Sequence, residues 1–134
     1  MDPIILVDTD VFSFVFRGDP RANLYEDMLV DRKLALSFMT VAELHQWACT
    51  RNWGDARLKS LEDAIGARII VDSSTNLCRE WARVRTTCAR AGRPISAQDA
   101  WNAAIAMHFK MPLVSHNAKD YEALEELVLW TASE

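Results

Sequence analysis

Acidic and amide side chains occur in this sequence where hydrophobic segments end and where helical segments begin. The residues concerned are Asp8, Asp10, Glu43, Asp99, Asn117 and Asp120. Carboxylate oxygens without cysteine or histidine ligands suit Mg²⁺ or Mn²⁺. A divalent cation held in this way generates hydroxide from water and stabilises the charge on a phosphate group. If the fold brings these side chains together, they indicate phosphoryl-transfer chemistry.

Helix capping is an alternative explanation for most of these acids taken singly. Asp is a preferred N-cap residue, so Asp8 is explained about equally well as the cap of the helix that follows it. Thr40 and Glu43 fit the T-x-x-E capping box, and Ser96 and Asp99 fit the related S-x-x-D pattern. Asp99 has one additional feature, because the alanine-rich segment after it predicts a closely packed helix that would partly desolvate its carboxylate.

Short apolar runs alternate with helical patterns along the chain. We expect strands at 3–8, 33–38, 68–72 and 112–115, with a fifth at the sheet edge over 127–130. We expect helices at 11–16, 21–30, 40–51, 55–65, 75–91, 96–109 and 119–126. This order predicts an α/β domain with a mostly parallel sheet of four to five strands.

A parallel sheet would gather the acids at one edge. Ligands of open α/β sheets bind outside the carboxyl ends of the strands, which is where Asp8, Glu43, Asn117 and Asp120 are expected. Two carboxylates about 4 Å apart repel by ~4 kcal/mol at an effective dielectric constant near 20. Three or four converging carboxylates therefore require cations.

Length and composition are those of an ordinary globular protein. The 134 residues suffice for a single domain spanning 1–134, and 50% of them are hydrophobic. No apolar run reaches the ~18 residues that a membrane helix needs, and no signal peptide is visible. The three cysteines lack CxxC spacing, which argues against a disulfide framework and a zinc site and favours a reducing cytoplasm.

The net charge of −4 argues mildly against nucleic-acid binding, because phosphate contacts favour a basic surface. This argument weakens if several of the acids share bound cations, which would neutralise them in the working site.

The acidic segments together resemble the PIN domain, and specifically a VapC-type toxin of a bacterial toxin–antitoxin pair. The matching segments have the order and spacing of that family and cover essentially the whole chain. They are Leu6-Val7-Asp8-Thr9-Asp10-Val11, Thr40-Val41-Ala42-Glu43-Leu44, Asp99-Ala100-Trp101-Asn102-Ala103-Ala104, and Leu113-Val114-Ser115-His116-Asn117 with Asp120-Tyr121.

The resemblance implies a three-layer α/β/α fold with a parallel sheet and an acidic Mg²⁺ site. It also implies endoribonuclease activity on tRNA or ribosomal RNA, inhibition by a cognate VapB-like antitoxin, and a tendency to form homodimers. By position, Asp8, Glu43 and Asp99 correspond to the three central acids of the family.

The fourth acidic position is open between two residues. Some relatives have an acid where this chain has Asn117, and others have one at the position of Asp120. We predict that Asp120 is the fourth acid and that Asn117 is its neutral neighbour in contact with substrate. Tyr121 is interpreted as a packing residue, and Asp10 as a supporting residue behind the metal ligands.

Two further features concern partners. Arginines cluster on the segment 75–91 and just after it, and Arg93 is the best candidate for a phosphate contact because it is nearest to Asp99 in sequence. Trp47, together with Val41, Leu44 and Ala48, forms an apolar stripe on the Glu43 helix. Core packing explains this stripe, but part of it could instead accept an antitoxin helix, with an antitoxin arginine in the acidic pocket.

Other protein classes also place an Asp after a first strand. The phosphatase pattern DxDx[TV] would begin at Asp8, but this chain has Phe12 at the fifth place of the pattern. Receiver domains have paired acids ahead of their phosphorylated Asp, whereas Asp2 is the one acid that precedes Asp8 here. A non-catalytic PIN-like binding module is a further alternative, against which the complete set of acids argues. Mg²⁺-dependent RNA cleavage that EDTA stops would separate these three alternatives from a ribonuclease.

Overall fold

A five-stranded sheet runs through the middle of the molecule, and each neighbouring pair of its strands is parallel. The structure is a computed structural model, and it describes residues 3–132. The strand order is β3-β2-β1-β4-β5. The bounds are Ile5–Val7 for β1, Leu34–Ser37 for β2, Ile69–Val71 for β3, Leu113–Val114 for β4 and Leu129–Trp130 for β5.

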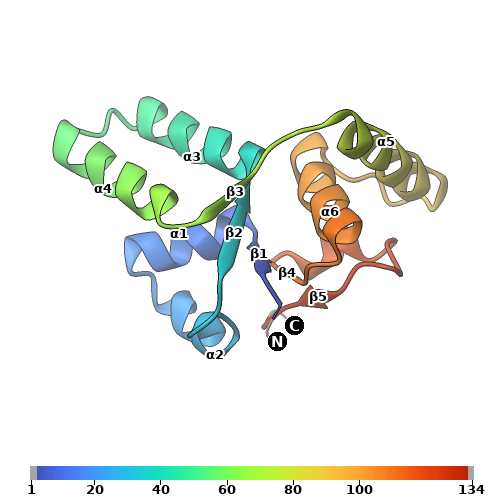
Figure 1. Cartoon of the computed structure of the whole chain (residues 1–134), viewed down its shortest axis with the longest axis horizontal. Helices are drawn as coiled ribbons and strands as arrows, with labels where there is room; N and C mark the ends of the chain where they lie inside the picture. The colour runs from blue at the N-terminus through green and yellow to red at the C-terminus, as the bar shows by residue number, and fades with distance from the viewer. Residues whose placement is uncertain (1–2, 133–134) are drawn as a thin grey trace.

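Helices cover both faces of this sheet, which gives three layers (Figure 1). One face carries α1 (Thr9–Arg17), η1 (Pro20–Tyr25), α2 (Glu26–Leu29), α3 (Phe38–Thr50) and α4 (Asp55–Gly66). The other carries α5 (Thr75–Arg90) and α6 (Ala97–Phe109), while the short η2 (Ala118–Tyr121) follows β4. The expected α/β/α architecture with a parallel sheet is confirmed, with five strands in the described part of the chain.

The central strand β1 shows why the sheet needs both layers. Its side chains alternate between the faces, so that Ile5 and Val7 pack into the core under α1, α3 and α4, while Leu6 packs into the core under α5 and α6. All three are buried. A strand buried on both faces reads as a continuous apolar run, which is what the sequence shows before Asp8.

Two segments that we expect to be α-helices form 3₁₀ helices and turns instead. The segment expected as one helix over 21–30 is a 3₁₀ helix, η1, followed by the single turn α2. The reason lies at its start, where Pro20 sets the first turn and the Ala22 amide donates to Asp19 O in an i→i+3 bond.

The segment expected as a helix over 119–126 consists of η2 followed by turns. Its buried residues are Tyr121, Leu124 and Leu127, and the Leu124 and Leu127 amides donate to the carbonyl three residues earlier. A spacing of three matches the 3.0 residues per turn of a 3₁₀ helix rather than the 3.6 of an α-helix. Burial of every third side chain therefore selects the tighter winding.

Across residues 3–132, none of the helices combines the length and the apolar character needed to span a membrane.

Candidate active site

A pocket of about 170 Å³ lies at the carboxyl ends of β1, β2 and β4. Its lining consists of Asp8, Thr9, Asp10, Glu43, Trp47, Asp99 and Asn117. Four of these seven residues are acidic and none is basic, so a cation inside the pocket would find carboxylate oxygens on several sides. These acids come from the β1–α1 junction, from α3 and from the first turn of α6.

Asp8 forms the floor of this site and is 4% exposed. Its Oδ1 accepts hydrogen bonds from the Thr9 amide and from Asn102 Nδ2, both at 2.8 Å. Its Oδ2 accepts from Ser115 Oγ at 2.7 Å and from the Tyr121 hydroxyl at 2.8 Å. Four donors explain how a carboxylate tolerates burial without a basic partner. Asp8 is also the N-cap residue of α1. It therefore both caps this helix and lines the acidic pocket.

A chain of buried polar groups joins Asp8 to Glu43. Asn102 Oδ1 accepts a hydrogen bond from Ser37 Oγ at 2.6 Å, and Ser37 Oγ lies 3.3 Å from Thr40 Oγ1. Thr40 Oγ1 is 3.0 Å from Thr9 Oγ1, which is also 3.0 Å from Glu43 Oε1. Side chains from four secondary-structure elements thus fix the position of Glu43 relative to Asp8.

Glu43 projects from the second turn of α3, and burial raises the pKa of its carboxyl, with the nearby Asp8 acting in the same direction. The expected T-x-x-E capping box is wrong, because α3 begins at Phe38 and its N-cap lies three residues before Thr40. Ser37 is the N-cap, and its Oγ accepts from the Thr40 amide. Glu43 is therefore not needed to cap the helix, and capping no longer explains its presence at the pocket.

Asp99 stands in the first turn of α6, where the expected cap is confirmed because Ser96 Oγ accepts from the Asp99 amide at 3.0 Å. Burial raises the pKa of the Asp99 carboxyl to about 6, with further contributions from the charges of Asp8 and Asp120. The expected partly desolvated environment is therefore what the structure provides, at the N-terminal end of a helix whose next turns are buried.

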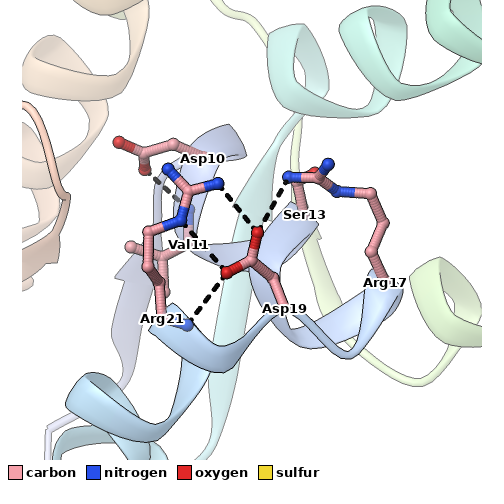
Figure 2. A network of polar contacts seen from close by, with 6 residues as sticks. All are labelled: Asp10, Val11, Ser13, Arg17, Asp19 and Arg21. Carbon is pink, nitrogen blue, oxygen red and sulfur yellow. Dashed lines mark hydrogen bonds and ion pairs between the residues drawn. The ribbon is translucent and has the colours of Figure 1, made fainter.

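Asp10 lines the pocket beside Asp8. Burial raises the pKa of Asp10 to about 7, and the charge of Asp8 adds to this effect. Its oxygens accept from the Val11 amide at 2.6 Å and the His116 amide at 3.0 Å. Figure 2 shows the Arg21 side chain reaching from η1 toward Asp10, while Asp19 accepts from Arg21 Nε and Nη2 at 3.1 and 2.8 Å.

The three remaining predicted site residues lie at different distances from the pocket. Asn117 is exposed and belongs to its lining. Asp120 does not line it, although its charge is close enough to raise the pKa of Asp99. Arg93 is not part of the lining either, and its guanidinium forms an ion pair with Glu122. Whether Asn117 or Asp120 supplies the fourth position of the site stays a prediction.

Sequence reasoning missed three residues that hold Asp8. Asn102 is fully buried in the apolar α6, and an isolated amide in an alanine-rich helix was a signal that could have identified it. Ser115 carried no such signal. Tyr121 packs in the core as expected and is also a hydrogen-bond donor, and burial, then Asp8, raises its pKa well above 10, so that it retains its proton.

The chemistry of the donor set fits a hard divalent cation. The pocket offers carboxylates and one amide, and burial disfavours their charged forms when no cation is present. Among residues 3–132, however, no three Asp, Glu, His or Cys side chains are grouped tightly enough to hold an ion by themselves. A hard divalent cation in this pocket would therefore need water molecules to complete its coordination.

Two sequence relatives of this chain are named ribonucleases. The chain is 24% identical to a protein named ribonuclease VapC1 from Haemophilus influenzae, over 92% of this chain and 94% of the relative. It is 29% identical to ribonuclease VapC5 from Mycobacterium tuberculosis, over 90% of this chain and 87% of the relative.

The solved structures of similar fold include proteins of toxin–antitoxin systems. VapBC2 from Rickettsia felis, bound to promoter DNA, matches with a TM-score of 0.82 at 21% identity, covering 96% of this chain and 98% of the other. VapBC-1 from nontypeable Haemophilus influenzae matches with a TM-score of 0.80 at 23% identity, covering 96% and 97%. At these identities the likeness concerns the fold.

The family profile described as PIN domain matches residues 5–127, which include the acids of the pocket and the residues that hold Asp8. This match covers far more than half of the chain and agrees with the parallel sheet, the layers and the acidic pocket at its carboxyl edge. The chain therefore belongs to the PIN domain family.

Proposed function

We propose that this chain is a metal-dependent endoribonuclease that acts as the toxin of a type II toxin–antitoxin module and hydrolyses phosphodiester bonds in tRNA or ribosomal RNA. The observation that carries the proposal is the pocket in which carboxylates from three parts of the fold converge without a basic residue in the lining. The relatives are named ribonucleases, and they match this chain over nearly their whole length, which supports the same activity.

Within this proposal, Asp8 and Asp99 are the main metal ligands. Glu43 and Asp120 complete the acidic environment directly or through water. The ion is Mg²⁺, with Mn²⁺ as a substitute, and when bound it would activate water and offset the charge on the phosphate.

The other residues of the site position these groups. The buried chain of hydroxyls keeps Glu43 in register with Asp8, and Tyr121 remains a donor that holds the Asp8 carboxylate. Asn117 is a candidate substrate contact at the pocket. Arg93 is proposed as a phosphate contact too, which requires its exposed ion pair with Glu122 to open when RNA binds.

The partners follow from the same proposal. A VapB-like antitoxin is supported by the neighbouring structures, which are VapBC complexes. The stripe suggested for its helix is mostly unavailable, because Leu44 and Ala48 are buried in the core and only Trp47 reaches the pocket. Homodimer formation and a cytoplasmic location belong to the proposal as well, on the family resemblance and the cysteine pattern respectively.

The phosphatase and receiver alternatives lose their support, since the chain matches the PIN domain family over residues 5–127. A non-catalytic PIN-like module is distinguished by experiment.

The deciding experiment is RNA cleavage by the purified protein with Mg²⁺, with EDTA, and with the Asp99→Asn variant. Asp99 is the better position to change, because Asp8 has four hydrogen-bond donors and its replacement also perturbs the core. We expect cleavage with Mg²⁺, none with EDTA, and a loss of at least about a hundredfold in Asp99→Asn that retains the wild-type circular dichroism spectrum. Equal cleavage by Asp99→Asn would trace the activity to a contaminant and contradict the proposal.

A further inference from the structure

Trp47 is the one residue of the pocket lining that the acid chemistry does not use. The other lining residues are acids, a hydroxyl and an amide, whereas Trp47 places a half-buried indole beside them. Core packing accounts for part of its surface only, since Trp47 packs at the margin of the core under α3. An aromatic surface next to a phosphate-cleaving centre has the chemistry that stacks on a nucleobase.

The neighbours of Trp47 along α3 extend this arrangement. Glu43 and Trp47 lie four residues apart on one side of α3, and Arg51, the C-cap residue of that helix, follows after four more residues. The Arg51 guanidinium lies over the Trp47 ring, 5.2 Å from its centroid. Arg51 is exposed, and among the ion pairs formed by residues 3–132 none involves it.

These three residues therefore run from acid to aromatic to cation over about 12 Å, at 1.5 Å rise per residue. This length and order suit a short stretch of single-stranded RNA leaving the acidic pocket. A base can stack at the middle position and a phosphate can pair with the cation at the far end.

We propose that Trp47 and Arg51 form a nucleotide subsite, in which Trp47 stacks on an unpaired base next to the scissile phosphate and Arg51 binds a neighbouring phosphate. The inference rests on the proposed ribonuclease function and adds which residues hold the RNA beside the cut. Trp47 and Arg51 are positioning residues, which hold the RNA while the acids act.

The chain contains a matched control. Trp53 is also half-buried and also lies beneath an arginine, with the Arg57 guanidinium 4.2 Å from its ring centroid. Trp53 stacks on Phe16 and does not belong to the pocket lining. Substitution of Trp53 or Arg57 therefore reproduces the local chemistry outside the subsite.

The test measures binding of a short, fluorescein-labelled single-stranded RNA of random sequence by anisotropy, with Mg²⁺ and in the Asp99→Asn background so that the RNA stays intact. We expect Trp47→Leu to weaken binding at least about fivefold and Trp47→Phe to weaken it less than about twofold, because stacking needs an aromatic ring. Trp53→Leu should leave the affinity unchanged. Equal affinities of Trp47→Leu and Trp53→Leu, or equal losses for Leu and Phe at position 47, would overturn the stacking role.

Two further measurements separate stacking from packing and charge. On an abasic ribose-phosphate oligomer of the same length, Trp47→Leu should have no effect, whereas a merely structural role would weaken both RNAs alike. Arg51→Gln should reduce the slope of log Kd against log salt by about 0.7, the value for one phosphate of a single strand, while Arg57→Gln should not.

Failure of this inference is distinguishable from failure of the proposed function. If the wild-type protein cleaves RNA but the position 47 variants bind like the controls, only the subsite is wrong. If Trp47→Leu leaves RNA binding intact but weakens binding of a VapB-like antitoxin, the stacking role is wrong and the indole is an antitoxin contact. If the wild-type protein neither binds nor cleaves RNA, the proposed function itself fails.

Discussion

At the residue scale, the buried carboxylate of Asp8 depends on donors that carry no charge. Its four hydrogen bonds come from an amide of the backbone, a side-chain amide and two hydroxyls. Hydrogen bonds to a charged group contribute about 1.5–3 kcal/mol each, and a carboxylate left without one of them is strongly penalised. The surroundings of Asp8 are therefore part of the site as much as the acid itself.

Replacement of Asn102 by alanine tests this dependence. The change removes the donor to Asp8 Oδ1 and the acceptor of Ser37 Oγ from the core. We expect the free energy of unfolding to fall by about 2–4 kcal/mol, measured by urea denaturation, and cleavage to fall with it. Asn76→Ala, which removes an exposed contact with Arg79, should stay within about 0.5 kcal/mol of wild type. Equal stability of the two variants would show that Asp8 does not need Asn102.

At the element scale, helix starts place the acids. Asp8 caps α1, Ser37 caps α3 and Ser96 caps α6, so each acid of the pocket lies at or within two turns of a helix N-terminus. The unpaired amides and the partial positive charge of these ends favour negative groups. The sequence pattern identified the cap at Ser96 correctly and placed the start of α3 wrongly, because Ser37 and Thr40 both satisfy the preference for a cap residue.

Two serine caps allow the positioning effect to be separated from helix stability. Ser96 caps α6 beside Asp99, whereas Ser74 caps α5 away from the pocket. Each Ser→Ala change should lower the free energy of unfolding by about 1 kcal/mol. Only Ser96→Ala should also slow RNA cleavage, measured in single turnover, since it frees the first turn that carries Asp99. A similar loss of rate in Ser74→Ala would mean that stability, rather than position, limits the activity.

At the scale of the whole molecule, the parallel sheet concentrates negative charge at one edge and stores an electrostatic cost there. Burial and mutual repulsion raise the pKa of Asp10 to about 7 and that of Asp99 to about 6, from an ordinary value near 3.8. Between roughly pH 4 and 7 the metal-free folded protein therefore binds protons that the unfolded chain does not hold. The linkage applies to the whole chain if residues 1–134 unfold as the single domain that the sequence predicts, and this domain assignment stays a prediction.

The sign of this linkage gives a test on the intact protein. Because the folded state holds the extra protons, its stability without metal should rise as the pH falls from about 8 to about 5. The lowered pKa of Asp19 acts in the opposite sense only at lower pH. Added Mg²⁺ should raise the melting temperature more at pH 8 than at pH 5, because protons compete with the ion for the carboxylates. Thermal melts in EDTA that show the highest stability at pH 8 would contradict the raised pKa values.

The sequence by itself determined the alternation of strands and helices, the parallel sheet, and the acids that the sheet edge would gather. Those features depend on local periodicity and on residue type, which neighbouring positions encode. It also identified Asp8, Glu43 and Asp99, all of which line the pocket. It identified Asp120 too, which does not line the pocket but whose charge raises the pKa of Asp99.

Only the tertiary structure decided how the site is held and what surrounds it. The side-chain donors to Asp8 lie 94, 107 and 113 residues away in the chain, so no local pattern links them to it. In the folded chain Arg93 forms an ion pair with Glu122, and Trp47 becomes part of the lining of the acidic pocket. The pKa values of Asp10 and Asp99 likewise arise from burial and from charges on other elements, which exist only after the chain has folded.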